Sequence, residues 1–308
     1  MKQKKDKNVP KVSIISVNYN QAAVTVELLE SIKQLSFKDL EVIVVDNASK
    51  EDPTAALLAT YPTVKLIKSA DNLGFAGGNN LGIDASTGDY LFFINNDAEI
   101  VEGTIEQLLA LFHRVPNLGV VSPKLCYYTP EASIDTIQYA GSTEVSNFTG
   151  RNRTLGELEE DNGQYVVAKP TAYAHGAAMM IPRAAMEKVG KMPEEFFLYY
   201  EELDWCAQFR RAGYEIYIEP NALVYHKESL SVGKMSPLKT YYVNRNRIYF
   251  MRRNKSRLEF LTFSIYLFFV ALPKHVLSFI VKREWQHLNV LLKAVRWNYS
   301  NESERFAF

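Results

Sequence analysis

The sequence is poor in cysteine and has no excess of charge of either sign. Its 308 residues include only 2 cysteines, Cys126 and Cys206, which form neither a CxxC pair nor a disulfide framework. A reducing compartment is therefore the default environment. The 35 basic and 35 acidic residues give a net charge of +0. Because a dedicated nucleic-acid-binding protein normally carries a basic excess, this balance predicts no nucleic-acid partner.

The N-terminus lacks the pattern of a signal peptide. Residues 1–10 contain four lysines, but no apolar segment follows within signal-peptide range. We therefore expect a solvated basic tail and a cytoplasmic protein.

The common phosphate-binding fingerprints are also missing. Residues 71–80 read DNLGFAGGNN, which is neither a Walker loop nor a GxGxxG that follows the first strand. Glycines in such a loop let the backbone turn sharply and let a ligand come close. A short helix predicted at residues 81–85 could direct its N-terminal amides at a phosphate. The dinucleotide-binding and ATPase classes therefore lack their signature.

What the sequence does contain is an alternation of strand and helix patterns in its first half. Apolar runs typical of buried strands occupy residues 12–17, 40–45, 64–67 and 90–94. Helix patterns occupy residues 22–34 and 53–61. The short connections between them predict βαβ units, and hence an α/β fold with a mostly parallel sheet flanked by helices.

Three of these strands end in clusters of Asn and Asp. The clusters are Asn18-Tyr19-Asn20, Asp46-Asn47 and Asn95-Asn96-Asp97. A polar turn or a helix cap would explain any one of them. However, the carboxyl ends of parallel strands share one edge of a sheet, where open α/β folds bind ligands, so the recurrence favours a site. Asp97 is suited to a divalent cation and a phosphate-bearing substrate, and Asp46 to a ribose hydroxyl.

A second acidic cluster follows an aromatic run. Residues 196–206 read FFLYYEELDWC, so Glu201, Glu202 and Asp204 stand at the start of a predicted helix. The helix dipole favours acidic residues in a first turn, which would make them capping residues. The neighbouring aromatics would also desolvate a carboxylate and raise its pKa, as a general base needs. Both interpretations stay open from the residues alone.

The order of these segments resembles a known family. SIISVNYN, VIVVDNAS, DNLGFAGGNN and YLFFINNDAEI are similar to motifs of family 2 glycosyltransferases with the GT-A fold, and more narrowly of bacterial rhamnosyltransferase-like members. That family usually carries Asp-x-Asp at the strand end, where this chain has Asn95 first and Asp97 last. The resemblance implies a Rossmann-like transferase of nucleotide-diphosphate sugars.

The resemblance also implies roles for individual residues. It implies a Mn²⁺ or Mg²⁺ site at Asp97 and at His226, which follows a strand predicted at residues 222–224. It implies Glu202 as the catalytic base, with Glu201 and Asp204 as alternatives. The donor-binding residues that it implies are Asn18, Asn20, Asp46, Asn72, Gly74, Asn79, Asn95 and, as a phosphate or acceptor contact, Arg245.

The activity implied by the resemblance is that of an inverting glycosyltransferase. The donor would be dTDP-rhamnose or a UDP-sugar, and the acceptor a hydroxyl of a glycan or of a polyprenyl-diphosphate-linked saccharide in cell-surface polysaccharide synthesis. Acceptor contacts are expected in the polar stretch at residues 127–165, and residues 227–236 are expected to close over the donor.

Two other functional classes remain. A sugar-phosphate nucleotidyltransferase shares the architecture, but it normally has a Gly-rich, Arg-containing loop after the first strand, which residues 18–25 lack. A non-catalytic membrane-bound interaction protein would not need aligned acidic and amide clusters.

The C-terminal part combines basic residues with apolar helix patterns. Six basic residues between Arg245 and Arg257 precede an uncharged apolar run at residues 260–273, which is shorter than the ~20 residues of a membrane span. We expect an interfacial or re-entrant helix and a peripheral location at the inner face of the cell membrane. A core helix or a contact within an oligomer is the alternative. The predicted organisation is a basic tail (1–10), a catalytic domain (11–240, with a donor half 11–125 and an acceptor half 126–240) and a helical extension (241–308).

Overall fold

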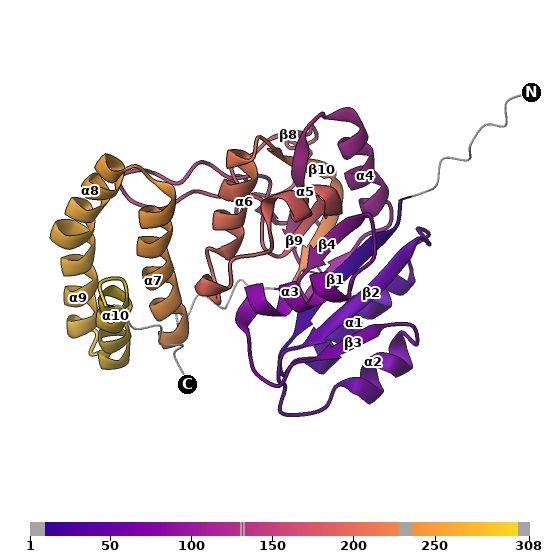
Figure 1. The fold of residues 1–308 in the computed structure, drawn as a ribbon, viewed down its shortest axis with the longest axis horizontal. Helices are drawn as coiled ribbons and strands as arrows, with labels where there is room; N and C mark the ends of the chain where they lie inside the picture. Colours follow the sequence, from indigo (N-terminus) through magenta and orange to yellow (C-terminus); the bar gives the residue numbers. More distant parts are fainter. Residues whose placement is uncertain (1–9, 130, 132, 228–235, 301–308) are drawn as a thin grey trace, which may run out of the picture.

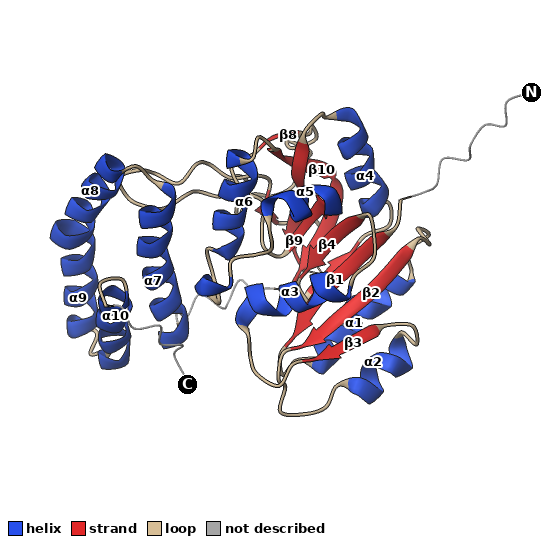
Figure 2. Cartoon of the chain, viewed as in Figure 1, coloured by secondary structure: helices blue, strands red, loops and turns tan. Residues whose placement is uncertain are grey.

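The computed structural model describes residues 10–129, 131, 133–227 and 236–300. A sheet with helices on both faces forms the larger part of the chain, and a further layer of helices follows at the C-terminal end (Figure 1, Figure 2). The predicted α/β architecture with a helical C-terminal extension is confirmed.

The strands of the described residues join in one sheet of the order β3-β2-β1-β4-β9-β6-β10-β5, with β7 on β6 and β8 on β10. Their bounds are β1 Val12–Asn18, β2 Leu40–Asp46, β3 Lys65–Lys68, β4 Tyr90–Ile94, β5 Ala98–Ile100, β6 Leu118–Tyr127, β7 Ile137–Tyr139, β8 Lys169–Pro170, β9 Ala178–Pro182 and β10 Glu215–His226. The strands β1 to β4 are parallel, as predicted, whereas β9 is antiparallel to β4 and β6. The sheet is therefore parallel in its first half and mixed in its second.

Helices cover both faces of this sheet, which explains the continuous apolar runs. On one face lie α1 (Ala22–Lys33), α2 (Thr54–Thr60) and α4 (Thr104–Arg114), and on the other α3 (Gly74–Ala85), α5 (Arg183–Val189) and α6 (Glu201–Arg211). Adjacent strand residues alternate between the two cores. Ile14 and Phe92 pack on the first face, and Ile15 and Phe93 on the second.

The strand register brings the polar clusters together. Asn18 at the end of β1 pairs with Asp46 at the end of β2, and β4 runs parallel to β1 on its other side. The three Asn and Asp clusters therefore lie at one edge of the sheet, as expected.

The glycine-rich stretch is helical, which differs from the predicted loop followed by a short helix at residues 81–85. The helix α3 already begins at Gly74. A Cβ added at Gly78 would lie 2.9 Å from the Val17 side chain, and one added at Gly82 would lie 2.3 Å from that of Ile15. The glycines therefore let α3 approach β1 closely.

The second half differs from the expected strands at their ends. The apolar stretch at residues 174–181 forms a strand only from Ala178, because a bridge between His175 and Ala178 closes a turn. The strand expected at residues 222–224 is the last part of the longer β10.

The C-terminal layer consists of helices joined by short turns in the described residues from 237 to 297. It consists of α7 (Pro237–Asn254), α8 (Arg257–Tyr266), a π-helical turn η2 (Leu267–Ala271), α9 (Leu272–Val281) and α10 (Trp285–Trp297). Together α8, η2 and α9 form a helix of 25 residues, which is long and apolar enough to cross a membrane by length and composition. Its buried side, with Phe263 and Leu267, packs on the core that lies between the sheet and the helices α3, α5 and α6. Residues 228–235 of the expected closing loop, residues 1–9 of the expected basic tail and residues 301–308 of the expected extension lie outside the described residues.

Candidate active site

A hydrogen-bonded network joins the ends of β1, β2 and β4. Asn18 is fully buried, and its Nδ2 donates to Asp46 Oδ1 at 2.8 Å and to Ser49 Oγ at 3.1 Å. Thr25 Oγ1 donates to Asn18 Oδ1 at 2.9 Å and accepts from Asn96 Nδ2 at 3.0 Å. Asn18 therefore holds the strand ends in register.

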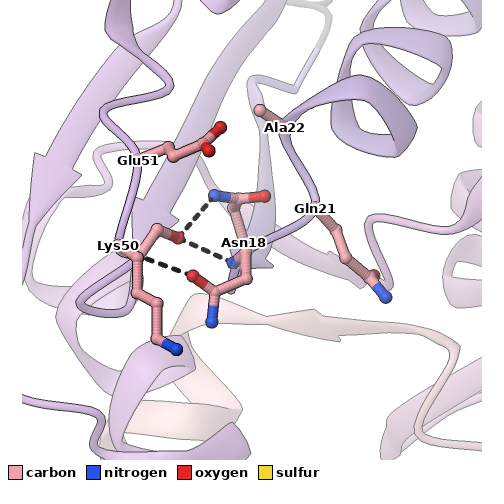
Figure 3. Close-up of a pocket in the computed structure, with 7 residues that line it drawn as sticks. Asn18, Gln21, Ala22, Lys50 and Glu51 are labelled. Atoms are coloured by element: carbon pink, nitrogen blue, oxygen red, sulfur yellow. Dashed lines mark hydrogen bonds between the residues drawn. The ribbon is translucent and has the colours of Figure 1, made fainter.

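A polar cavity of about 370 Å³ opens beside this network. It is lined by Asn18, Asn20, Gln21, Ala22, Ser49, Lys50 and Glu51 (Figure 3). The Lys50 backbone N–H donates to Asn20 Oδ1 at 2.8 Å, and Ser49 Oγ accepts from the Asn20 N–H at 2.8 Å. The loops after β1 and β2 are thus tied together around a volume within the range of small-molecule sites.

The expected donor residues of the glycine-rich stretch lie elsewhere than on this cavity. Asn72 Oδ1 accepts from Asn47 Nδ2 at 3.0 Å and from the Gly74 N–H at 2.9 Å. Asn79 is 2% exposed, and its Nδ2 donates to Phe75 O at 2.9 Å. These side chains hold the first turn of α3.

Asp97 and His226 meet near the ends of β4 and β10. His226 Nε2 lies 3.0 Å from Asp97 Oδ1 and 3.3 Å from the Asn95 side-chain nitrogen. His226 Nδ1 faces Gln138 Oε1 at 2.9 Å. An amide oxygen only accepts, so Nδ1 carries a proton and Nε2 is directed at Asp97. Burial works to raise the pKa of Asp97, but the hydrogen bond and charge of His226 outweigh it and hold that pKa below its usual value.

This pair has the chemistry of half a divalent-cation site. The Asp97 side chain is 32% exposed, and Gln138 orients the imidazole as an outer hydrogen-bond partner orients a metal-binding histidine. In the part of the chain that the structure describes, no group of three or more His, Cys, Asp and Glu residues gathers as a metal site. Asp97 and His226 would therefore supply two ligands to Mn²⁺ or Mg²⁺, which prefer oxygen-rich sets that substrate phosphates and water can complete.

Asp204 is the most enclosed member of the acidic trio. It is fully buried, Oδ1 accepts from Asn254 Nδ2 at 2.6 Å, and Oδ2 accepts from Gln208 Nε2 at 2.8 Å. Arg253 Nε lies 3.2 Å from its Oδ1. This carboxylate therefore joins α6 to α7.

Glu201 and Glu202 have different surroundings. Glu201 is 3% exposed and its Oε2 has no hydrogen-bond partner among the described residues. Burial and the neighbouring Glu202 charge raise the pKa of Glu201 well above its usual value. Glu202 is only partly buried, and this burial raises its pKa to about 6. Glu202 is therefore the more accessible carboxyl of the pair.

The turn at His175 and Gly176 links Glu202 to the Asp97–His226 pair. A Cβ added at Gly176 would lie 3.7 Å from Glu202 Cγ. The His175 ring lies edge-on to the His226 ring, with 6.3 Å between their centroids. His175 Nδ1 accepts from the Ala177 N–H at 3.1 Å, and burial lowers the His175 pKa to about 3, so this ring is neutral. Glu202 and the candidate cation-binding residues Asp97 and His226 therefore border the same turn.

The segment before α6 has a strained backbone. Phe197, Tyr199 and Tyr200 have φ angles of 62°, 68° and 75°, a region that costs free energy for residues other than glycine. The Asn246 side chain is fully buried, and its Nδ2 donates to Leu198 O at 2.8 Å and to Tyr199 O at 2.7 Å. Asn246 therefore helps to hold the conformation that directs Glu201 and Glu202, a role that the sequence analysis missed.

Arg245 holds the same segment from the other side. It is 3% exposed, and its Nη2 donates to Glu195 O at 2.7 Å and to Phe196 O at 2.6 Å. Its guanidinium also lies 4.5 Å from the Trp297 ring centroid. Arg245 is predicted as a phosphate or acceptor contact, and its guanidinium is hydrogen-bonded to the backbone of the segment before α6. The sequence signal for this role was the adjacent pair Arg245 and Asn246 among aromatic residues. Both side chains are buried in the structure, where they need hydrogen-bond partners.

Comparison with known proteins agrees with this architecture. The family described as Glycosyl transferase family 2 matches residues 13–190. The chain is 30% identical over 209 residues to the low-salt glycan biosynthesis hexosyltransferase Agl10 of Haloferax volcanii. The alignment covers 67% of this chain and 63% of that protein. It is 24% identical over 243 residues to the N-acetylglucosaminyl-diphospho-decaprenol L-rhamnosyltransferase of Mycobacterium tuberculosis, covering 72% and 77% respectively.

Solved structures show the same fold. The mannosyltransferase PcManGT from Pyrobaculum calidifontis, in complex with GDP-Man and Mn²⁺, superposes with a TM-score of 0.58 at 17% identity, over 97% of this chain and 80% of that one. The predicted GT-A fold is thereby confirmed. The family match spans more than half of the chain, and the chain belongs to glycosyl transferase family 2.

Proposed function

We propose that this protein is an inverting glycosyltransferase of glycan synthesis, which moves a hexose from a nucleotide-diphosphate donor to an acceptor hydroxyl. The observation that carries the proposal is Glu202, the most accessible carboxyl of the acidic trio, beside a turn that also borders Asp97 and His226. Displacement of a diphosphate needs a base on one side of the reacting atoms and a cation-binding site, here Asp97 and His226, on the other.

The donor nucleoside would occupy the cavity at the ends of β1 and β2. Asn20, Ser49 and Lys50 offer amide, hydroxyl and ammonium groups there, and Asp46 accepts a hydrogen bond from the lining residue Asn18. The similarity to an L-rhamnosyltransferase favours dTDP-rhamnose as the donor of this protein, and a UDP-sugar is the alternative donor. The donor diphosphate would then extend toward Asp97.

The leaving group would be held by Asp97 and His226. A Mn²⁺ or Mg²⁺ bound there would neutralise charge that develops on the departing diphosphate. Gln138 keeps the His226 ring in the orientation and tautomer for that task. Support for a cation of this kind also comes from the Mn²⁺ in the PcManGT structure.

Glu202 would remove the proton from the attacking acceptor hydroxyl. Its raised pKa of about 6 matches a base that is charged at neutral pH and still binds a proton well. The pKa of the neighbouring Glu201 is raised by burial and by the Glu202 charge, which favours its neutral form. Asp204, with its three polar partners, would serve as a structural link.

The helix from Arg257 to Val281 would lie on the inner face of the cell membrane. One side packs on the protein, while large apolar side chains are exposed on the other: Leu258, Leu261, Ile265, Phe268, Phe269, Val270, Leu277, Ile280 and Val281. Exposed cations at Arg257, Lys274, Lys282 and Arg283 suit anionic lipids. Sedimentation with phosphatidylglycerol vesicles tests this surface, and a protein that stays in the supernatant would refute it.

A donor panel tests the proposed activity. We expect hydrolysis of one nucleotide sugar, among dTDP-rhamnose and several UDP-sugars, that requires Mn²⁺ and is lost in Asp97→Ala. A nucleotidyltransferase would instead form a nucleotide sugar from a sugar phosphate and a nucleoside triphosphate. A non-catalytic protein would do neither, and either result would contradict the proposal.

A further inference from the structure

The turn at residues 174–178 carries one polar side chain, that of His175. The turn reads AHGAA, and the side chain of His175 is partly exposed. Its Nδ1 accepts a hydrogen bond from the Ala177 N–H at 3.1 Å, so this nitrogen carries no proton. The proton of the imidazole is therefore on Nε2, because a neutral ring has one donor and one acceptor nitrogen.

This Nε2–H donor has no partner in the described part of the chain. The hydrogen bonds of His175 use its backbone groups and Nδ1: its N–H donates to Ser122 Oγ at 3.3 Å, and its O accepts from the Ala178 N–H at 3.2 Å. Nε2 is also absent from the polar atoms that the described protein encloses without a partner, so water can reach it. Polar atoms of structural residues are normally bonded within the protein. An open donor therefore points to a ligand.

Neighbouring rings hold the imidazole of His175 in place. The centroid of its ring lies 5.3 Å from that of Tyr139 and 6.3 Å from that of His226. The hydroxyl of Tyr139 donates to Tyr173 O at 2.5 Å, which fixes the chain two residues before His175. A donor that is already held in position loses little entropy when a ligand binds.

The turn lies between the candidate base and the candidate cation-binding residues. A Cβ added at Gly176 would lie 3.7 Å from Glu202 Cγ. On the other side, Ala177 O accepts from the Asn95 N–H at 2.9 Å, and Asn95 stands two residues before Asp97. A sugar that is attacked from the Glu202 side, and whose diphosphate is held at Asp97, would lie against this turn.

We propose that the Nε2–H of His175 donates a hydrogen bond to a hydroxyl of the transferred hexose and thereby selects the donor sugar. This inference rests on the proposed function and names a specificity-determining residue of the same site. A hydroxyl is the matching partner because the neutral ring offers one hydrogen bond and no charge, whereas Asp97 and His226 are placed for the diphosphate and its cation. A site built to bond a substrate hydroxyl also rejects a sugar that lacks it.

Calorimetry with the full chain in the presence of Mn²⁺ tests this proposal. The probes are dTDP-rhamnose against dTDP and UDP-glucose against UDP, so that the ratio of the two affinities isolates the contacts of the sugar. His175→Phe keeps a ring and removes the donor. It is expected to weaken binding of the nucleotide sugar about tenfold and to leave binding of the nucleoside diphosphate unchanged. His175→Gln places an amide N–H near the same position and is expected to restore part of the affinity.

Tyr139→Phe is the matched control for a structural role of this turn. It removes the hydrogen bond to Tyr173 O and keeps the ring beside His175. We expect it to lower the temperature of unfolding and to leave the affinity ratio unchanged.

Three outcomes would overturn the assignment of His175. They are an unchanged affinity ratio in His175→Phe, equal losses for the nucleotide sugar and the nucleoside diphosphate, and the same change of ratio in Tyr139→Phe. An unmodified chain that binds none of the four compounds would instead overturn the proposed function, and this inference with it.

Discussion

Replacing Gly74 by alanine tests the contact between α3 and the segment that precedes α6. Gly74 has φ +72°, and an added Cβ would lie 2.2 Å from Phe197 O. A residue with a side chain costs about 1–2 kcal/mol in this left-handed region. The Phe197 carbonyl must also move and give up the 2.7 Å hydrogen bond from the Phe75 N–H, which costs about 1 kcal/mol more. We expect Gly74→Ala to lower the free energy of unfolding by about 2–3 kcal/mol.

Gly103→Ala is the matched control for this variant. Gly103 has φ +83° but nothing within 4 Å of an added Cβ, so it should cost only the backbone part, about 1–2 kcal/mol. Urea unfolding of the three proteins gives the comparison. Gly74→Ala should also slow sugar transfer, because Phe197 leads into Glu201 and Glu202, whereas Gly103→Ala should not. Equal losses of stability in the two variants would contradict the reasoning.

Three further predictions concern the acidic helix α6 and the strained segment before it. The rate of transfer, as kcat/KM, should rise as pH passes about 6, because Glu202 must lose its proton to act; a flat profile from pH 5 to 8 would argue against this base. Because the pKa of Glu202 is raised in the folded protein, the free energy of unfolding should fall as pH rises from about 4.5 to 6. Glu202→Gln should reduce that fall, and the remainder belongs to Glu201, whose pKa is also raised. Asn246→Ala should lower kcat more than it raises the donor KM, because it releases the carbonyls of the strained segment. Its control is Asn244→Ala, whose side chain, among the described residues, donates to Thr240 O of its own helix. An equal kcat in both variants would refute the positioning role.

The strand edge was the most predictable part of the molecule. Apolar runs that end in Asn18, Asp46 and Asp97 could be placed at one edge from the parallel geometry alone. The register of β1 and β2 then follows, with Asn18 opposite Asp46. Continuous apolar runs were a sufficient signal because these strands are buried on both faces of the sheet.

Side-chain direction and the use of glycine could not be predicted in the same way. Gly78 and Gly82 serve close packing on β1, which a sequence cannot separate from a flexible loop. Glu202 and Asp204 are two positions apart on a helix, or roughly 200°, so only one of them can face a given pocket. Which one does depends on the partners Asn254 and Arg253 from a distant helix.

The central claim is that Glu202 is the catalytic base, and Glu202→Gln tests it most directly. The substitution keeps the size of the side chain and removes its ability to accept a proton. Transfer of the sugar, measured with the donor and cation identified by the hydrolysis panel, should fall at least about 100-fold, while the affinity for the nucleotide sugar stays unchanged. Wild-type transfer by Glu202→Gln would contradict the account.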